Sequence, residues 1–286
     1  MPDHGGYIMK VIRTIAEARA ERAKHERLAL VPTMGALHAG HMSLITAAGQ
    51  HAPSVAVSIF VNPTQFGPRD DFNKYPRPIE ADLEKCRQAG VDFVFNPPPE
   101  EMYRPGMFNI VVDLPNLTDV LEGQKRPGHF KGVCQVVAKL FNILTPNVAC
   151  FGQKDFQQLR IIEAMVEGLD FPIEIVRCPT LREPDGLAMS SRNAYLSPEE
   201  RNKALQISKA LRQAEEQVKV GYRQANRLVA TMKNTLLEQP QILIDYVAAV
   251  DCQTLRAAQD VTTPTLLALA IRVGNTRLID NTIVYP

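Results

Sequence analysis

LVPTMGALHAGHMSL, residues 30–44, marks the point where a buried strand gives way to a helix. The apolar run that opens this stretch stops at Pro32, and an apolar pattern resumes at Met42. A short continuous apolar run is typical of a strand buried on both faces. Two histidines, His38 and His41, lie between the strand and the helix. At this level they could be metal ligands, buried structural residues or groups that bind phosphate.

The same order of apolar run, polar loop and helical pattern recurs along the first two thirds of the chain. Alternation of strands and helices is typical of an α/β doubly wound fold with a parallel sheet. One helical stretch, residues 132–144, is mostly apolar, so we expect it to pack against the sheet. The predicted strands are residues 28–31, 55–61, 91–95, 148–151 and 173–176, and the predicted helices are residues 42–50, 79–89, 132–144 and 156–167.

The pattern changes after Ser197, which resembles a helix N-cap followed by Pro198 and two acidic residues. Two long charged helices are then followed by strands without alternation, which indicates a smaller α+β domain. We therefore predict domains at residues 9–184 and 185–286, with the boundary inside the loop 181–197. The predicted helices are residues 199–220 and 225–238, and the predicted strands are residues 242–250, 266–274 and 282–285.

Composition limits the classes of partner. The 286 residues are 45% hydrophobic and 22% charged, and 32 basic against 31 acidic side chains give a net charge of +1. Such a balance gives no overall electrostatic footprint for nucleic acid or an anionic membrane surface. No apolar stretch reaches the ~20 residues of a membrane span, and the first eight residues look like an extension without the layout of a secretory signal. Five widely spaced cysteines without a CxxC pair predict reduced thiols in a cytoplasmic protein.

The loop after the first strand favours phosphate handling without deciding it. Gly40 would let backbone approach a ligand closely, and His41 falls near the start of a helix, where free N–H groups attract anions. A metal site needs a third ligand, and the stretch contains no HExxH pattern and no neighbouring acid or cysteine. Structural and metal roles for the two histidines therefore stay open from the local pattern alone.

Amides mark the next loop, FVNPTQFG at residues 60–67. Asn62 and Gln65 follow a buried strand, and amides at a strand end can orient a small polar substrate through both donor and acceptor. A simply capped turn explains this loop equally well.

The third loop, FGQKDFQQL at residues 151–159, sets Lys154 and Asp155 before a helix whose first turn holds Gln157 and Gln158. A lysine over a helix start suits a polyphosphate, although a solvated Lys–Asp pair is the alternative.

The fourth loop, DGLAMSSRNAYLS at residues 185–197, places Ser190 and Ser191 beside Arg192 at the predicted domain junction. These groups could clamp a triphosphate. A further cationic loop, RPGHFKG at residues 126–132, precedes another helix. Ligands of parallel α/β sheets bind beyond the carboxyl ends of the strands, so the joint occurrence of these loops indicates a site for a phosphate-bearing ligand.

Five segments in this order resemble the pantothenate synthetases, also called pantoate–β-alanine ligases: PTMGALHAGH, SIFVNPTQF, RPGHFKGV, FGQKDFQQL and DGLAMSSRNAYL. The likeness runs from about residue 28 to residue 196 and continues through RLIDN near the C-terminus. It implies a Rossmann-like first domain, similar to that of the nucleotidylyl transferases and class I aminoacyl-tRNA synthetases. It also implies ATP-dependent joining of (R)-pantoate to β-alanine through a pantoyl adenylate, with Mg²⁺, releasing AMP and pyrophosphate. Relatives are commonly dimers, so a homodimer is expected.

The resemblance also implies residue roles. His38 and His41 would contact the ATP phosphates, with His41 as proton donor, and Lys154 and Arg192 would complete the catalytic set. Asp82 would hold Mg²⁺ through water. Gln65, Gln158 and Asn62 would bind pantoate, and Gln65 would also position β-alanine. The implied ATP-binding residues are Met34, Gly35, His38, Gly40, His41, Gly152, Lys154, Asp155, Leu181, Met189, Ser190, Ser191 and Arg192. One departure is Gln153, where many relatives have glutamate.

Three rival functions share parts of this pattern. An adenylyltransferase acting on a phosphate-bearing acceptor would keep the fold but need extra basic residues in the acceptor pocket. A tRNA synthetase would need a basic anticodon-binding module, which the segment after Ser197 does not resemble. A metal-stabilised or nucleotide-sensing module would use the histidine pair without catalysis.

Overall fold

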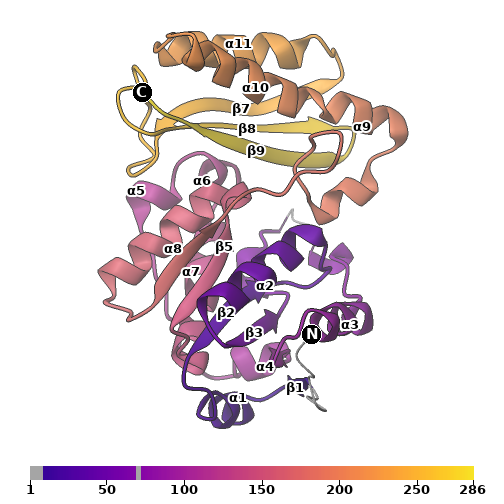
Figure 1. The fold of residues 1–286 in the computed structure, drawn as a ribbon, viewed down its shortest axis with the longest axis vertical. Coiled ribbons are helices and arrows are strands. Elements are labelled where there is room, and N and C mark those ends of the chain that lie inside the picture. Colours follow the sequence, from indigo (N-terminus) through magenta and orange to yellow (C-terminus); the bar gives the residue numbers. More distant parts are fainter. Residues whose placement is uncertain (1–8, 69–71) are drawn as a thin grey trace.

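The computed structural model describes residues 9–68 and 72–286, so the predicted extension before Met9 lies outside the described residues. Figure 1 shows two units, with the N-terminal sheet and its helices at the bottom and the small C-terminal sheet beneath two long helices at the top. Over the described ranges, the helices are too short or too polar to cross a membrane.

The N-terminal unit is a six-stranded sheet in which every neighbouring pair is parallel. Its strand order is β1-β4-β3-β2-β5-β6, so the chain builds outward from β2 on one side and from β5 on the other. This order confirms the predicted doubly wound fold. The edge strand β1 was not predicted, because three residues are too few for a recognisable apolar run. The bounds are β1 Lys10–Ile12, β2 Leu28–Thr33, β3 Ser54–Ile59, β4 Phe93–Phe95, β5 Val148–Gly152 and β6 Glu174–Cys178.

Helices cover both faces of this sheet. On one face α2 (Ala39–His51) and α3 (Ile79–Gln88) contribute Ile45, Ala48, Leu83 and Cys86 to a core with strand side chains. On the other face α7 (His129–Leu144) and α8 (Phe156–Gly168) pack over Leu30, Phe93 and Phe95. The apolar stretch 132–144 therefore packs on the sheet as predicted. The remaining helices are α1 Ile15–Arg22, α4 Pro99–Met102, α5 Pro115–Thr118 and α6 Glu122–Lys125, with 3-10 turns η1 Pro63–Gln65, η2 Phe72–Lys74, η3 Gln153–Asp155 and η4 Ser191–Tyr195.

The C-terminal unit is an antiparallel three-stranded sheet with helices on one face. The strands are β7 Ile242–Asp251, β8 Thr265–Val273 and β9 Thr276–Val284, in the order β7-β8-β9. The helices are α9 Pro198–Ala204, α10 Gln206–Lys219 and α11 Ala225–Leu237.

Two predicted elements of this unit had wrong bounds. The helix expected over 199–220 breaks at Leu205 without a proline or glycine to signal the break. The last strand is longer than the expected 282–285, because the polar residues Arg277, Asp280 and Asn281 interrupt its apolar pattern and are nonetheless largely covered.

The two units share a packed interface. Val250, Leu266 and Ala268 of the small sheet, with Cys252 just after β7, belong to the same apolar cluster as the α7 and α8 side of the large sheet. The opposite side of the small sheet packs against α10 and α11 in a separate core. The predicted boundary near residue 184 lies in the loop between β6 and η4, which a β-bridge between Arg182 and Ala188 tightens. The division at this residue stays a prediction.

Candidate active site

A cavity of about 260 Å³ opens where the strand order reverses, between β2 and β5. The loops after β2, β3, β5 and β6 meet there, as expected for ligand sites of parallel α/β sheets. Of the residues predicted to contact substrates or metal, all but Gly35 and Asp82 line this cavity: Met34, His38, Gly40, His41, Asn62, Gln65, Gly152, Lys154, Asp155, Gln158, Leu181, Met189, Ser190, Ser191 and Arg192. The fold thus brings together segments that lie far apart in the sequence.

The loop between β2 and α2 has an unusual backbone that Asp82 of α3 holds in place. Gly35 and Ala36 have φ values of 83° and 51°, a region that L side chains rarely adopt. The two carboxylate oxygens of Asp82 accept hydrogen bonds from the backbone N–H of Ala36 (2.7 Å) and Leu37 (2.8 Å). The Asp82 side chain is 1% exposed. Its contacts favour a positioning role for this residue, and its predicted contact to Mg²⁺ through water stays untested.

His38 and His41 interlock at the N-terminus of α2. His38 is the N-cap residue, and its Nδ1 accepts from the backbone N–H of Gly40 at 3.1 Å. The backbone N–H of His38 in turn donates to Nδ1 of His41 at 3.2 Å. Since both Nδ1 atoms accept, each neutral ring carries its proton on Nε2. The centroids of the two rings lie 4.1 Å apart, with the ring planes tilted by 39°. The arrangement leaves each Nε2–H available as a hydrogen-bond donor.

Burial keeps both histidines neutral. It lowers the pKa of His38, with the positive charge of Lys154 adding to the effect. Burial also lowers the pKa of His41 to about 3, and the charge of the neighbouring His38 ring lowers it in the same direction to a smaller extent. At neutral pH these side chains therefore act as uncharged donors in the protein without ligand. A bound triphosphate would raise both pKa values, because nearby negative charge favours the protonated form.

Gly40 makes room for a neighbouring side chain, and its predicted close approach to a ligand stays a prediction. A Cβ atom at this position would lie 2.9 Å from Cε1 and Nδ1 of the His38 ring. The absent side chain therefore makes room for His38, and the close approach is that of the ring to the helix backbone. Gly40 also lines the cavity, as expected for a residue of the predicted ATP loop.

Asn62 organises the loop after β3 and uses both ends of its amide for protein contacts. Its Oδ1 accepts from the hydroxyls of Tyr103 (2.8 Å) and Thr64 (3.0 Å), and its Nδ2 donates to Gln65 Oε1 (3.1 Å) and to the carbonyl of Gly132 (3.0 Å). The Asn62 side chain is 1% exposed. These contacts orient the Gln65 amide at the cavity wall. They favour a positioning role for Asn62, whose predicted direct contact to pantoate stays untested.

Neighbouring glutamines at the start of α8 have different surroundings. Gln157 is buried, where Oε1 accepts from the backbone N–H of Glu122 (3.0 Å) and Nε2 donates to the carbonyls of Leu117 (2.8 Å) and Val120 (2.9 Å). Gln158 is half-buried and lines the cavity. Helical spacing separates the roles, because consecutive residues of a helix point about 100° apart.

Cations and hydroxyls complete the opposite wall of the cavity. Lys154 in η3 lies 3.7 Å from Asp155, and its side chain is 22% exposed. Ser190 caps η4 by accepting from the backbone N–H of Arg192 at 3.3 Å. Met189 and Leu181 are joined by a backbone hydrogen bond of 3.0 Å. Gln153, the departure noted in the sequence, is not among the residues that line this cavity.

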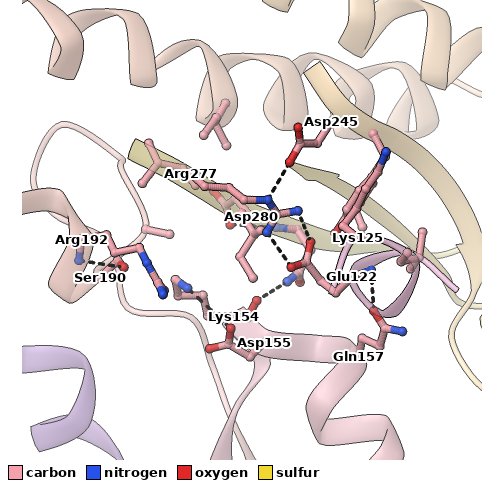
Figure 2. A pocket seen from close by; sticks show the side chains of 18 of the residues that line it. Glu122, Lys125, Lys154, Asp155, Gln157, Ser190, Arg192, Asp245, Arg277 and Asp280 are labelled. Atoms are coloured by element: carbon pink, nitrogen blue, oxygen red, sulfur yellow. Dashed lines mark hydrogen bonds and ion pairs between the residues drawn. The ribbon is translucent and has the colours of Figure 1, made fainter. Parts of the chain in front are cut away.

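A larger cavity of about 450 Å³ adjoins the first and lies between the two units. It shares Lys154, Asp155, Gln158, Ser190 and Arg192 with the first cavity. Figure 2 shows the ion-pair group at its wall, in which Arg277 of β9 makes a bidentate contact to Glu122 (2.6 and 2.8 Å) and a contact to Asp245 (2.6 Å). A desolvated bidentate pair of this kind fixes the relative orientation of the two elements.

The sequence did not assign functions to several residues that shape this region. Tyr103 holds Asn62, and Arg277, Asp280 and Asn281 of the RLIDN segment contact the N-terminal unit or its connecting loop. The likeness in RLIDN was the only signal for the last three. Nothing in local periodicity identifies their partners outside the C-terminal sheet, which lie about 100 residues or more away in the chain.

Comparisons with known proteins agree with this geometry. The pantoate-beta-alanine ligase family model matches residues 8–283. A pantothenate synthetase of Moorella thermoacetica is 50% identical over 280 residues, which cover 96% of this chain and 99% of that protein.

Solved structures give the same result. The crystal structure of a pantothenate synthetase from Thermus thermophilus matches with a TM-score of 0.93 and 44% identity, covering 97% of this chain and 100% of that one. A pantoate-beta-alanine ligase from Francisella tularensis, complexed with "Beta-gamma ATP" and β-alanine, matches with a TM-score of 0.79 and 33% identity, covering 96% and 98%. A family match over almost the whole chain, with relatives near half identity, leaves one conclusion: this chain belongs to the pantoate–β-alanine ligase family.

Proposed function

We propose that this chain joins (R)-pantoate to β-alanine with ATP, releasing AMP and pyrophosphate, at the cavity beyond β2 and β5. The observation that carries the proposal is the composition of that cavity in a member of this family. The cavity is lined by the amide of Gln65 and by the cationic or hydrogen-donating side chains of His38, His41, Lys154 and Arg192. An acid substrate and a polyphosphate can therefore be held side by side.

Activation of the carboxylate comes first, because a carboxylate is a poor electrophile and an amine attacks it slowly. The pantoate carboxylate, oriented by Gln65 and Gln158, attacks the α-phosphorus of ATP and forms pantoyl adenylate. Negative charge then grows on the pyrophosphate leaving group. Lys154 and Arg192 stabilise this charge as cations, and positioned groups of this kind supply much of the rate enhancement in many enzymes.

His38 and His41 contribute as neutral Nε2–H donors in this proposal. Their Nδ1 atoms are occupied by backbone N–H groups, which fixes both tautomers. Donors held in advance need no reorganisation when the charge develops. Burial lowers the pKa of His41 to about 3, so this ring stays neutral, and it is the donor we assign to the charge that grows in the transition state.

In the second step the neutral amine of β-alanine attacks the adenylate carbonyl and AMP leaves. No covalent bond to the protein is required, and burial raises the pKa of Cys134 to about 12 and that of Cys252 to about 11, values that do not favour a nucleophilic thiolate. The apolar wall of the cavity, which includes Phe60, Val133 and Val136, suits the dimethyl end of pantoate. Closure of the C-terminal domain over the adenylate would exclude water.

Mg²⁺ fits this site as an ion carried by the nucleotide. Within residues 9–68 and 72–286, no group of three His, Cys, Asp or Glu side chains could hold a metal by itself. Mg²⁺ commonly binds through one or two carboxylates, several waters and substrate phosphates. Asp155, whose side chain is 49% exposed at the cavity wall, is the carboxylate that would hold it. Asp82 would reach the ion only through water, because it does not line the cavity and both of its oxygens accept from backbone N–H groups. When bound, the ion neutralises phosphate charge.

Product analysis tests the reaction. The protein is incubated with ATP, Mg²⁺, pantoate and β-alanine, and we expect equal amounts of pantothenate, AMP and pyrophosphate. ATP–pyrophosphate exchange should require pantoate. Oxygen-18 placed in the pantoate carboxylate should appear in AMP. Exchange that proceeds without pantoate, or that requires a phosphate-bearing acceptor instead, would identify the rival adenylyltransferase.

Lys154 and His41 test the residue roles. We expect Lys154→Ala and His41→Ala each to lower the single-turnover adenylation rate by roughly 10²-fold or more, the scale for loss of one charge-stabilising donor. The control is Lys219→Ala, because Lys219 is an exposed residue at the end of α10. Normal rates in both site variants would contradict these assignments.

A homodimer is the proposed assembly, formed through residues 107–111. Four apolar side chains of this segment face solvent: Met107 is 59%, Phe108 96%, Ile110 69% and Val111 55% exposed. Its placement is fixed, because Gln135 of α7 donates to Asn109 Oδ1 and to the Ile110 carbonyl, both at 2.8 Å. An apolar segment of this kind can pair with its own copy across a two-fold axis.

The five free, buried cysteines also support the cytoplasmic location that we propose for the protein.

A further inference from the structure

The RLIDN segment, Arg277–Asn281 of β9, places polar groups at the interface between the two units. Asp280 and Asn281 lie within this strand and are only 2% and 7% exposed, although both side chains are polar. Side chains alternate between the faces of a strand, so Arg277 and Asn281 share one face. Their contacts show that this face is directed toward the N-terminal unit. Buried polar groups require partners, and those of Asp280 and Asn281 belong to loops of the candidate active site.

Asn281 holds the backbone of the loop that carries Lys154. Its Nδ2 donates to the carbonyl oxygen of Lys154 at 2.7 Å and to that of Gln153 at 3.0 Å. An amide nitrogen has two hydrogens, so a single Nδ2 atom can satisfy both carbonyls. Because both partners are acceptors, the orientation of the amide is determined: the opposite orientation would set Oδ1 against two carbonyl oxygens.

The adjacent residue holds the second loop of the nucleotide site. Asp280 makes a bidentate ion pair with Arg182 (2.6 and 3.1 Å), and Arg182 also donates to the carbonyl of Gly186 at 3.2 Å. Arg182 directly follows Leu181 and lies in the same loop as Ser190 and Arg192. Two consecutive residues of one C-terminal strand therefore hold two of the loops whose cations line the cavity.

We propose that Asn281 is a positioning residue of the ATP-dependent step: it fixes the η3 backbone so that the Lys154 ammonium is held at the cavity wall. This inference rests on the proposed role of Lys154 in that step. It gives the RLIDN segment a function and makes one strand of the C-terminal unit part of the nucleotide site without touching the nucleotide. The positioning depends on the amide donor of Asn281. Aspartate has the same size but no donor, and alanine has neither the size nor the donor.

The main test is a set of kinetic measurements on Asn281→Ala. We expect kcat/KM for ATP to fall about tenfold, with KM for β-alanine within twofold of the original value. The loss should depend on Lys154. In a Lys154→Ala background, Asn281→Ala should lower the remaining rate by less than twofold, since the group that it positions is already absent. Asn281→Asp should lose at least as much as Asn281→Ala, because a carboxylate would face two carbonyl oxygens.

A matched control separates positioning from general stabilisation of the interface. Arg160 of α8 donates through Nε to the carbonyl of Gln253 at 2.9 Å, so it also joins the two units but away from the ATP loops. Arg160→Ala should leave kcat/KM for ATP within twofold. If Asn281→Ala fails to fold, Asn281→Ser takes its place in the test. Serine retains one hydrogen-bond donor, so we expect kcat/KM for ATP to fall about threefold in this variant.

The outcomes are distinct from those of the proposed reaction. If the unaltered protein makes no pantothenate, the proposed function fails before any variant is measured. If it is active, two results overturn the positioning role. One is kcat/KM for ATP within twofold in Asn281→Ala. The other is an equal loss on Asn281→Ala with and without the Lys154 side chain.

Discussion

Gly132 offers a test of how closely α7 must approach the loop that carries Gln65. A Cβ atom at this position would lie 2.4 Å from the carbonyl oxygen of Thr64 and 2.6 Å from the backbone nitrogen of Gln65. Both neighbours are backbone atoms, so they cannot rotate away as the end of a side chain can. In Gly132→Ala the loop must retreat by about 1 Å to restore ordinary contact. The hydrogen bond from Asn62 to the Gly132 carbonyl would be strained by the same movement.

Two opposing effects determine the stability of this variant. Alanine favours a helix over glycine by up to about 1 kcal/mol. Overpacking in a well-filled region costs about 1–3 kcal/mol, so we expect a net loss of about 1–2 kcal/mol in the free energy of unfolding. Gly49 in α2 is the matched control, because a Cβ atom there meets only Val55 Cγ2 at 4.0 Å. Gly49→Ala should be stabilised by up to about 1 kcal/mol.

Denaturant unfolding and steady-state kinetics measure both effects. We expect KM for pantoate to rise about tenfold in Gly132→Ala, which corresponds to about 1.4 kcal/mol, while Gly49→Ala keeps the original value. A Gly132→Ala protein that gains stability to the same extent as Gly49→Ala, with an unchanged KM for pantoate, would refute the argument from close approach.

Three further predictions concern His41, Asp82 and Phe108. The pKa of His41 is about 3 in the folded protein against 6.5 unfolded, so the unfolded state binds more protons between these pH values. The contribution of the neutral His41 to the free energy of unfolding should therefore be complete above pH 6.5. Below pH 6.5 the free energy of unfolding should fall by up to about 1.4 kcal/mol per pH unit. His41→Gln should flatten this acid slope in urea titrations at pH 4.5–7, and parallel curves would contradict the shift. Asp82→Asn should lower the free energy of unfolding by about 2 kcal/mol, because a charged acceptor of two backbone N–H groups is lost; an unchanged stability with a strongly raised Mg²⁺ requirement would indicate a metal ligand instead. Phe108→Asp should halve the mass measured by light scattering if the protein is a dimer, whereas the exposed-surface control Tyr222→Asp should not, and a monomeric unaltered protein would refute the interface.

Much of the architecture follows from local sequence. Continuous apolar runs at residues 28–31 and 148–151 became β2 and β5, because strands buried on both faces have no polar face. The run at residues 173–176 became β6, an edge strand in which Glu174 and Arg177 are exposed. Prediction from apolar runs missed most of β9. Its Arg277, Asp280 and Asn281 look like surface residues and are covered only because their partners arrive from the other unit or from the loop between the units.

Local sequence predicts the alternation of strands and helices, and the likeness to a family identifies the side chains that line the cavity. How these side chains are held depends on contacts between segments that lie far apart in the chain. Asp82 lies 45 residues from the Leu37 amide that it supports, and Asn281 lies 127 residues from the Lys154 carbonyl. Neighbouring residues in space share no local pattern, so periodicity cannot reveal such pairs. Burial likewise decides that His38 and His41 are neutral, because the desolvation that lowers their pKa values arises from the packed fold and not from the residues beside them in the chain.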